Sequence, residues 1–130
     1  MKRLLALFLS ALLLTGCGAA AGTAETIDFR QISQQEAAEI MEKEPEALIL
    51  DVRTPEDFAQ GHIAGALNLP NESISQQNLS LLPDKDQTIL IYCRSGNRSK
   101  QASRKLVDLG YTDILEFGGI NTWEGPIVTD

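Results

Sequence analysis

The chain has little of the residue types that build metal and nucleic-acid sites. Its 130 residues include one histidine and two cysteines, and aromatic residues make up 5%. One histidine and no paired cysteines give no zinc-type ligand spacing, so we expect no metal site and no cofactor. Basic residues are also scarce, with 11 Lys and Arg against 18 Asp and Glu and a net charge of −7. This negative charge argues against a nucleic-acid partner and against broad electrostatic adhesion to anionic lipid.

Long apolar runs are missing except near the N-terminus. The almost wholly apolar run from Leu4 to Leu14 follows Lys2 and Arg3, which is the pattern of an export signal. A membrane-spanning helix needs ~20 apolar residues, more than this run supplies. We therefore predict a signal peptide over residues 1–16.

The segment Leu14-Thr15-Gly16-Cys17, directly after the apolar run, resembles the lipobox of bacterial lipoproteins. The resemblance implies cleavage before Cys17 and a thioether-linked lipid on its sulfur. The alternative is ordinary secretion, with cleavage within residues 19–24. Residues 17–25 are small and polar and predict a flexible tether, and residues 26–130 predict one domain. We expect a protein of the cell envelope, held to a membrane by the lipid on Cys17 and facing outside the cytoplasm.

Cys93 is the only remaining thiol if Cys17 carries a lipid, so it cannot form an internal disulfide. An unpaired cysteine in an exported protein suggests a reactive thiol. The alternative is a buried structural cysteine, because free cysteines are often buried. The arginines and the glycine that follow Cys93 favour the reactive thiol.

The surroundings of Cys93 are typical of an anion-binding site. An apolar run over residues 89–92 ends at Cys93, a polar loop follows, and a helical pattern starts at Ser99. A helix N-terminus stabilises a thiolate through its unpaired N–H groups and its dipole. Arg94 and Arg98 add positive charge, which is unfavourable at a helix start unless an anion binds there. The alternative is that both arginines belong to a solvent-exposed face of the helix. The segment predicts a nucleophile at Cys93 and an anion-binding loop made of Arg94, Ser95, Gly96, Asn97 and Arg98.

Strand-like and helix-like segments alternate along the rest of the chain. Strands are predicted at 27–32, 47–52, 66–69, 88–92 and 113–117, and helices after Ser33, after Thr54, at 73–82 and at 99–109. A glycine pair at 118–119 predicts a turn. The alternation predicts an α/β domain with a mostly parallel sheet of about five strands and helices on both faces. Asp51 and Cys93 both end predicted strands, where such sheets bind ligands.

Several segments, in order and spacing, resemble the rhodanese-like domain family. The resemblance covers residues 27–126 and implies the three-layer fold of that family. It also implies a sulfurtransferase that moves sulfane sulfur from a small anionic donor such as thiosulfate to a thiophilic acceptor, cyanide or a thiol, through a persulfide on Cys93. Ala64 stands where the family commonly has Pro. The matching segments are Leu50-Asp51-Val52-Arg53, Glu56-Asp57-Phe58, Gly61-His62-Ile63-Ala64-Gly65-Ala66, Asn68-Leu69-Pro70, Tyr92-Cys93-Arg94-Ser95-Gly96-Asn97-Arg98-Ser99, and Gly118-Gly119 with Trp123.

Three further polar residues fall inside these segments. Asp51 is a candidate for orienting the active-site loop, and the alternatives are a structural partner for Arg53 or a helix cap. We predict supporting roles for Asp51 and Arg53. The resemblance implies a structural role for His62, and Trp123 is predicted to be core or pocket wall. We expect a monomer.

Two other functions are compatible with a reactive Cys93. The first is a cysteine phosphatase or arsenate reductase, but related phosphatases place five residues between Cys and Arg, whereas four separate Cys93 from Arg98. The shorter loop suits a sulfur atom better than a tetrahedral phosphate. The second is a sulfur-binding or relay module without turnover, and the presence of Cys93 with both arginines argues against an inactive module.

Overall fold

The computed structural model describes residues 26–129. The predicted signal peptide (1–16) and tether (17–25), with Cys17, lie outside this range. No helix within residues 26–129 is both long enough and apolar enough to cross a membrane.

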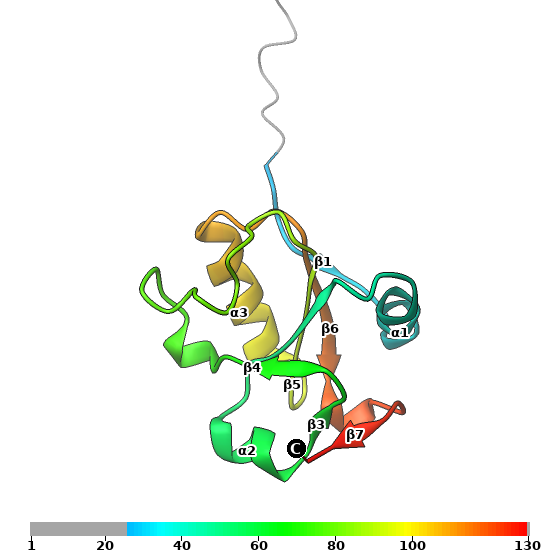
Figure 1. The fold of residues 1–130 in the computed structure, drawn as a ribbon. Coiled ribbons are helices and arrows are strands. Elements are labelled where there is room, and N and C mark those ends of the chain that lie inside the picture. Colours follow the sequence, from blue (N-terminus) through cyan, green and yellow to red (C-terminus); the bar gives the residue numbers. More distant parts are fainter. Residues whose placement is uncertain (1–25, 130) are drawn as a thin grey trace, which may run out of the picture.

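A central sheet of five parallel strands organises the domain (Figure 1). The order across the sheet is β1 (Arg30–Gln31), β6 (Ile114–Gly119), β5 (Ile89–Cys93), β2 (Leu48–Asp51) and β4 (Ala66–Asn68). β3 (His62–Ile63) and β7 (Ile127–Val128) form a separate antiparallel pair. The sheet confirms the predicted α/β fold, and β5, which carries Cys93 at its carboxyl end, occupies the centre.

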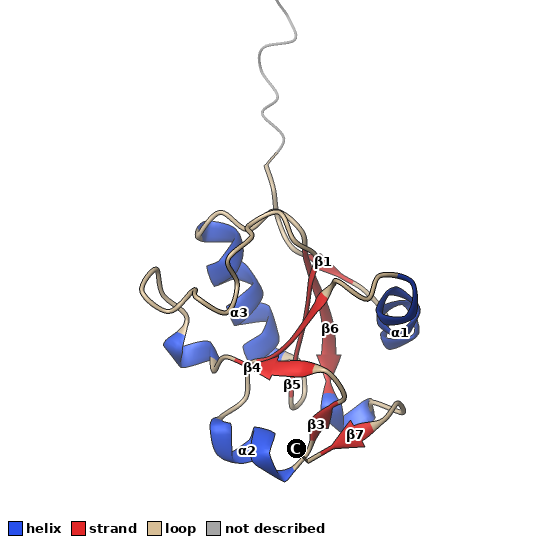
Figure 2. Ribbon diagram, in the orientation of Figure 1, coloured by secondary structure: helices blue, strands red, loops and turns tan. Residues whose placement is uncertain are grey.

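Helices cover both faces of the sheet (Figure 2). They are α1 (Gln34–Lys43), α2 (Pro55–Gln60) and α3 (Asn97–Asp108), with 3-10 turns η2 (Asn71–Ser73) and η3 (Ile120–Thr122). Ser33 begins α1 because its hydroxyl accepts the Glu36 N–H at 3.0 Å. Thr54 begins α2 in the same way, accepting the Asp57 N–H at 3.2 Å. Both caps are local in sequence and confirm the predicted helix starts.

The core is split by the sheet into two clusters. Successive side chains of a strand point to opposite faces. Ile89, Ile91 and Cys93 therefore pack on the side of α3, with Ala102 and Leu106 of that helix. Leu90 and Tyr92 pack on the side of α1, with Ala37, Leu115 and Phe117. The Cys93 thiol is thus directed toward the start of α3.

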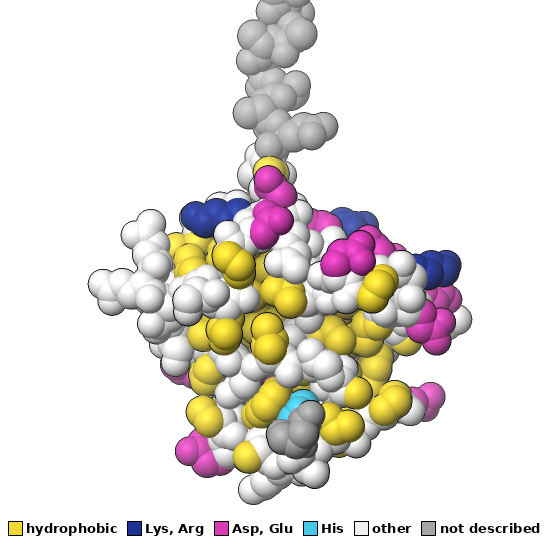
Figure 3. Space-filling view, viewed as in Figure 1, with side chains coloured by type: hydrophobic (Ala, Val, Ile, Leu, Met, Phe, Trp, Pro, Cys, Tyr) yellow, Lys and Arg dark blue, Asp and Glu magenta, His cyan; other side chains and the backbone are white. Residues whose placement is uncertain are grey.

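The surface carries few large exposed apolar side chains among the described residues. Those of Ile27, Leu81 and Ile127 are 49%, 43% and 46% exposed. Figure 3 shows acidic side chains gathered near the start of the described chain. Single exposed apolar residues are ordinary on protein surfaces.

The predicted helix at 73–82 is wrong. Only η2 forms there, and the chain then continues in turns until β5. Side chains satisfy the backbone instead, because Asn78 Nδ2 donates to the Ser73 carbonyl at 2.8 Å and Ser75 Oγ accepts the Gln77 N–H at 3.3 Å. Ile74 and Leu82 still reach the core from this irregular segment.

Two other boundaries also differ from the predictions. α3 begins at Asn97, two residues before the predicted start at Ser99, because Gly96 is its N-cap. β6 runs through Gly118–Gly119, where we predicted a turn, because Gly119 pairs with Cys93 of β5.

Candidate active site

Cys93 ends the central strand, and its side chain is 2% exposed. The ladder between β5 and β6 shifts register between Ile91 and Cys93, so that Cys93 lies opposite Gly119. Such irregularities re-aim a side chain at the end of a strand. The loop 94–96 then connects directly to the N-terminus of α3.

Hydrogen-bonding groups surround the thiol. The Gly96 N–H donates to Cys93 Sγ at 3.0 Å, and Ser99 Oγ lies 3.4 Å from the same sulfur. Burial raises the pKa of the Cys93 thiol, but hydrogen bonds from the Ser99 hydroxyl and from the N–H groups of Ser99, Gly96 and Ser95 outweigh it and hold the pKa below its usual value. The direction is the one expected from the sequence. The lowered pKa of Cys93 is caused by hydrogen bonds at the start of α3. The sequence also led us to expect a contribution from the charges of Arg94 and Arg98.

Two glycines shape the loop. Gly96 has φ of +111°, a left-handed conformation that L side chains rarely adopt. Gly119 is needed for space, because a Cβ there would lie 2.0 Å from the Arg94 carbonyl oxygen. The Asn121 N–H also donates to that oxygen, at 3.2 Å. The end of β6 thus holds the loop in place. The glycine pair is visible in the sequence, but its contact with the loop is not.

The thiol opens into a small pocket of about 190 Å³. Arg94 and Arg98 both have exposed side chains at its rim. Arg94 Nη2 contacts Asp57 Oδ1 of α2 at 3.1 Å, whereas Arg98 forms no ion pair with any residue from 26 to 129. Asp57 was not predicted as a site residue, although its segment carried part of the family resemblance. The pocket brings together Asp57, Cys93, Arg94, Ser95, Asn97 and Arg98.

Asp51 and Arg53 form a buried pair beside this pocket. Arg53 Nη2 donates to Asp51 Oδ2 at 2.7 Å, and Arg53 Nε lies 3.1 Å from both carboxylate oxygens. The Tyr92 hydroxyl donates to Asp51 Oδ2 at 2.7 Å and accepts the Ile63 N–H at 3.0 Å. Burial and the Asp51 hydrogen bond raise the pKa of Tyr92. Because Tyr92 directly precedes Cys93, this network fixes the end of β5.

Neither member of this pair lines the Cys93 pocket. Asp51 is placed as the partner of Arg53, one of the alternatives considered from the sequence. Arg53 lines a neighbouring hollow of about 500 Å³, which shares Asp57, Arg94 and Ser95 with the Cys93 pocket.

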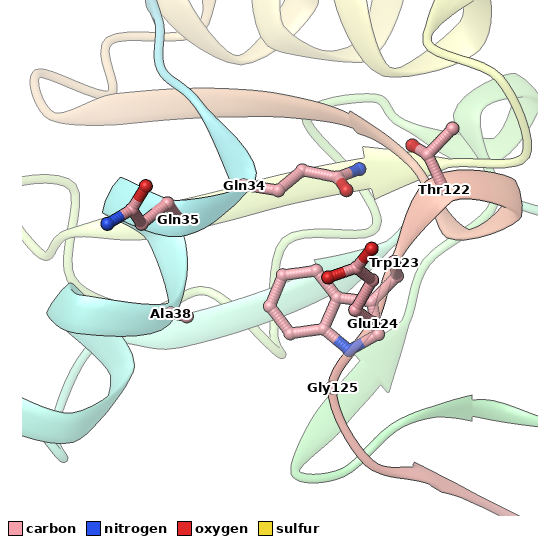
Figure 4. Close-up of a pocket in the computed structure, with 7 residues that line it drawn as sticks. All are labelled: Gln34, Gln35, Ala38, Thr122, Trp123, Glu124 and Gly125. Atoms are coloured by element: carbon pink, nitrogen blue, oxygen red, sulfur yellow. The ribbon is translucent and has the colours of Figure 1, made fainter.

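His62 and Trp123 also lie outside the Cys93 pocket. His62 Nδ1 lies 2.8 Å from the Phe58 carbonyl, and its ring stacks on Phe58 at 3.6 Å. Trp123 packs against Phe117 and forms a wall of a hollow of about 430 Å³ between α1 and the segment after β6 (Figure 4). Within the described range, no three His, Cys, Asp or Glu side chains are grouped as metal ligands.

Comparisons with known proteins agree with this geometry. A thiosulfate sulfurtransferase, PspE of Escherichia coli K12, is 38% identical over 79 residues, which are 61% of this chain and 76% of that protein. A sulfurtransferase of Allochromatium vinosum is 42% identical over 98 residues, 75% of this chain and 85% of that protein.

Solved structures show the same likeness. A structure described as rhodanese with anions from E. coli is 34% identical, has a TM-score of 0.60, and is matched over 65% of this chain and 99% of its own. The rhodanese-like domain of an Anabaena protein, solved by NMR, is 28% identical with a TM-score of 0.69, over 77% of this chain and 79% of its own. The model of the Rhodanese-like domain matches residues 33–125. These matches confirm the resemblance found in the sequence, and the chain belongs to the rhodanese-like domain family.

Proposed function

We propose that this protein is a sulfurtransferase of the thiosulfate sulfurtransferase type that works through a persulfide on Cys93. The observation that carries the proposal is the Cys93 thiol itself, which lies against the Gly96 N–H at 3.0 Å in a pocket rimmed by two arginines. A thiolate in such surroundings is a nucleophile, and the same donors suit an anionic donor and an anionic leaving group. The relatives named as sulfurtransferases support this activity.

The first half of the reaction loads the enzyme. The Cys93 thiolate attacks the outer sulfur of thiosulfate, and a new S–S bond forms. The S–S bond of thiosulfate breaks, and its electron pair leaves with sulfite. Three negative charges stand on each side, one on the protein and two on the small molecule. Arg94 and Arg98 offset the charge of the dianion at the rim, while the loop N–H groups face the sulfur.

The second half returns the enzyme to its starting state. An acceptor such as cyanide or a thiolate attacks the outer sulfur of the persulfide, the S–S bond breaks, and its electron pair returns to Cys93 Sγ. With cyanide the product is thiocyanate. A pocket of about 190 Å³ admits small donors and acceptors of this kind.

Intact-mass measurement tests the proposal directly. Incubation with thiosulfate should add the mass of one sulfur atom to the protein, cyanide should remove it, and the Cys93→Ser variant should gain nothing. A mass gain without steady-state turnover would indicate a relay module. Hydrolysis of a phosphoester, with no mass gain from thiosulfate, would indicate a phosphatase and contradict the proposal.

We also propose that the mature protein is attached to a membrane through a lipid on Cys17. The support is the sequence alone: Lys2 and Arg3, the apolar run, and the lipobox-like segment that ends at Cys17. Replacement Cys17→Ser should move the protein into the soluble fraction with its sulfur transfer unchanged. A variant that remains tightly membrane-bound would show that the anchor is misassigned.

A further inference from the structure

A buried carboxylate lies behind Cys93. Glu116 of β6 is 2% exposed, on the face of the sheet that α3 covers. Its Oε2 accepts the Gly118 N–H at 2.9 Å, and Gln31 Nε2 donates to Oε1 at 3.4 Å. No lysine or arginine in the described range pairs with it. Burying a carboxylate is costly unless it is hydrogen-bonded, so a carboxylate held by uncharged donors needs a reason.

Ser99 joins this carboxylate to the thiol. Its Oγ lies 2.5 Å from Glu116 Oε2 and 3.4 Å from Cys93 Sγ. A hydroxyl has one proton to donate and two lone pairs that accept. Glu116 Oε2 is the nearest acceptor, since the carbonyl oxygens of Gly96 and Gly118 lie at 2.9 and 3.5 Å. In the thiol state Ser99 therefore donates to Glu116 and accepts the S–H of Cys93.

We propose that Glu116 is a positioning residue that holds the Cys93 proton, through Ser99, while sulfur is bound, and returns it when sulfur leaves. The proposal rests on the sulfurtransferase function proposed above. As the thiol ionises, its proton moves to Ser99 Oγ and the Ser99 hydroxyl proton moves to Glu116 Oε2. One S–H and one O–H bond break and two O–H bonds form. The single negative charge moves from the carboxylate to the sulfur, and no redox change occurs.

This proton transfer leaves Glu116 neutral while the Cys93 sulfur is ionised. The buried site therefore holds only one negative charge when the donor dianion arrives. After the transfer, the Ser99 hydroxyl donates to the sulfur. When an acceptor later breaks the persulfide bond, Cys93 Sγ becomes the leaving group. The proton returns from Glu116 through Ser99 to that sulfur, which is general acid assistance to a departing thiolate.

Other charged groups around Glu116 do not offer the same route. β5 contributes Cys93, and β1 contributes Gln31 in direct register, with Arg30 next to it exposed. α3 contributes Ser99, and its charged residues nearby, Arg98 and Lys100, have exposed side chains. α1 packs on the opposite face of the sheet.

The test uses Glu116→Gln, which keeps the shape and an oxygen for the Gly118 N–H but removes the proton acceptor. Alkylation of Cys93 by neutral iodoacetamide is followed against pH by intact mass. In the wild type Glu116 takes up the thiol proton, whereas in the variant the proton must go to solvent, so the alkylation midpoint should move to higher pH, with a tenfold rate difference for each unit of displacement. In single-turnover experiments above the alkylation midpoint of both proteins, delivery of the persulfide sulfur to cyanide should slow by at least about tenfold, while loading from thiosulfate does not slow.

Ser103→Ala is the matched control. Ser103 is also buried in α3 and its Oγ donates to the Ser99 carbonyl at 2.7 Å, but it has no link to the thiol. It should change neither the alkylation profile nor either half-reaction. If Glu116→Gln does not fold, Ser99→Ala interrupts the same path. It should slow delivery to cyanide and, because it also removes a hydrogen bond to the sulfur, move the alkylation midpoint to higher pH.

Two results would overturn the proposal. One is an alkylation midpoint for Glu116→Gln that matches wild type or moves to lower pH, which would mean that Glu116 does not take up the thiol proton. The other is equal slowing of both half-reactions with a lowered Tm, which would mean a structural role only. The alkylation profile does not need sulfur transfer, so it remains decisive even if thiosulfate fails to load the wild-type protein and the sulfurtransferase function is rejected.

Discussion

Replacing Gly119 by alanine should inactivate the protein through its loop. The Gly119 backbone, with φ of −133°, suits any residue, so contact alone is the obstacle. The added Cβ would lie 2.0 Å from the Arg94 carbonyl oxygen and 2.6 Å from Ser95 Cα. Both are backbone atoms of the loop beside Cys93, and they must move by roughly 1–1.5 Å to restore ordinary contact.

A displacement of about 1 Å at a catalytic group can cost about a hundredfold in rate, or about 2.7 kcal/mol. Overpacking itself should cost about 1–3 kcal/mol of the free energy of unfolding. The assays are thiosulfate–cyanide kinetics, alkylation of Cys93 and thermal melting. The loss of kcat/KM should be far larger than the fraction of protein that thermal melting shows to be unfolded at the assay temperature.

Gly125→Ala supplies the matched control. Its Cβ would lie 2.7 Å from Trp123 Nε1, a smaller overlap, against a side chain that does not line the Cys93 pocket. It should lower Tm and leave kcat/KM nearly unchanged. If Gly119→Ala keeps wild-type kinetics, the loop is not held by the end of β6 and the reasoning fails.

Four further predictions concern the charges near the thiol. Arg98→Ala and Arg94→Ala should each lower kcat/KM for thiosulfate by roughly ten- to a hundredfold, because each loses a charge-assisted contact worth about 1.5–3 kcal/mol. The Lys variants should lie between Ala and wild type, and thermal melting should be unchanged in all four. Wild-type kinetics in both Ala variants would mean that only the backbone N–H groups bind the anion. Asp57→Asn frees Arg94 and should lower KM for thiosulfate by up to about fivefold, matching the 0.2–1 kcal/mol of an exposed ion pair; a raised KM would contradict this. Asp51→Asn breaks a buried pair and should cost about 3–5 kcal/mol in chemical denaturation, whereas an unchanged midpoint would remove its structural role. The midpoint of Cys93 alkylation in wild type should lie below that of an unstructured cysteine peptide, because the hydrogen bonds to sulfur favour the thiolate.

The features that could be predicted from the sequence depend on short stretches of chain. Ser33 and Thr54 begin helices because each hydroxyl accepts an N–H three residues later. The loop after Cys93 is equally local, since the Gly96 N–H reaches the sulfur across three residues. The parallel sheet follows from the alternation of strands and helices, which leaves few other topologies.

The remaining features depend on contacts between distant segments. Gly119 is required because β6 meets the loop after β5, and Asp57 reaches Arg94 from α2. Glu116 interrupts an apolar strand pattern, which normally indicates a solvent-facing position, yet α3 covers it and Ser99 binds it. None of these contacts has a periodicity or a spacing that sequence reasoning can detect. The helix predicted at 73–82 does not form for a different reason. Polar side chains in this segment form hydrogen bonds with the backbone that compete with those of a helix.

The outer strands of the central sheet are short, with two residues in β1 and three in β4. An edge strand exposes unpaired N–H and C=O groups on which another chain can add a strand. β1 and β4 are too short to offer more than a few such groups to another strand. The short outer strands therefore disfavour edge-to-edge pairing between copies of the domain, a protection that would matter most if the proposed lipid on Cys17 gathered copies on one membrane surface.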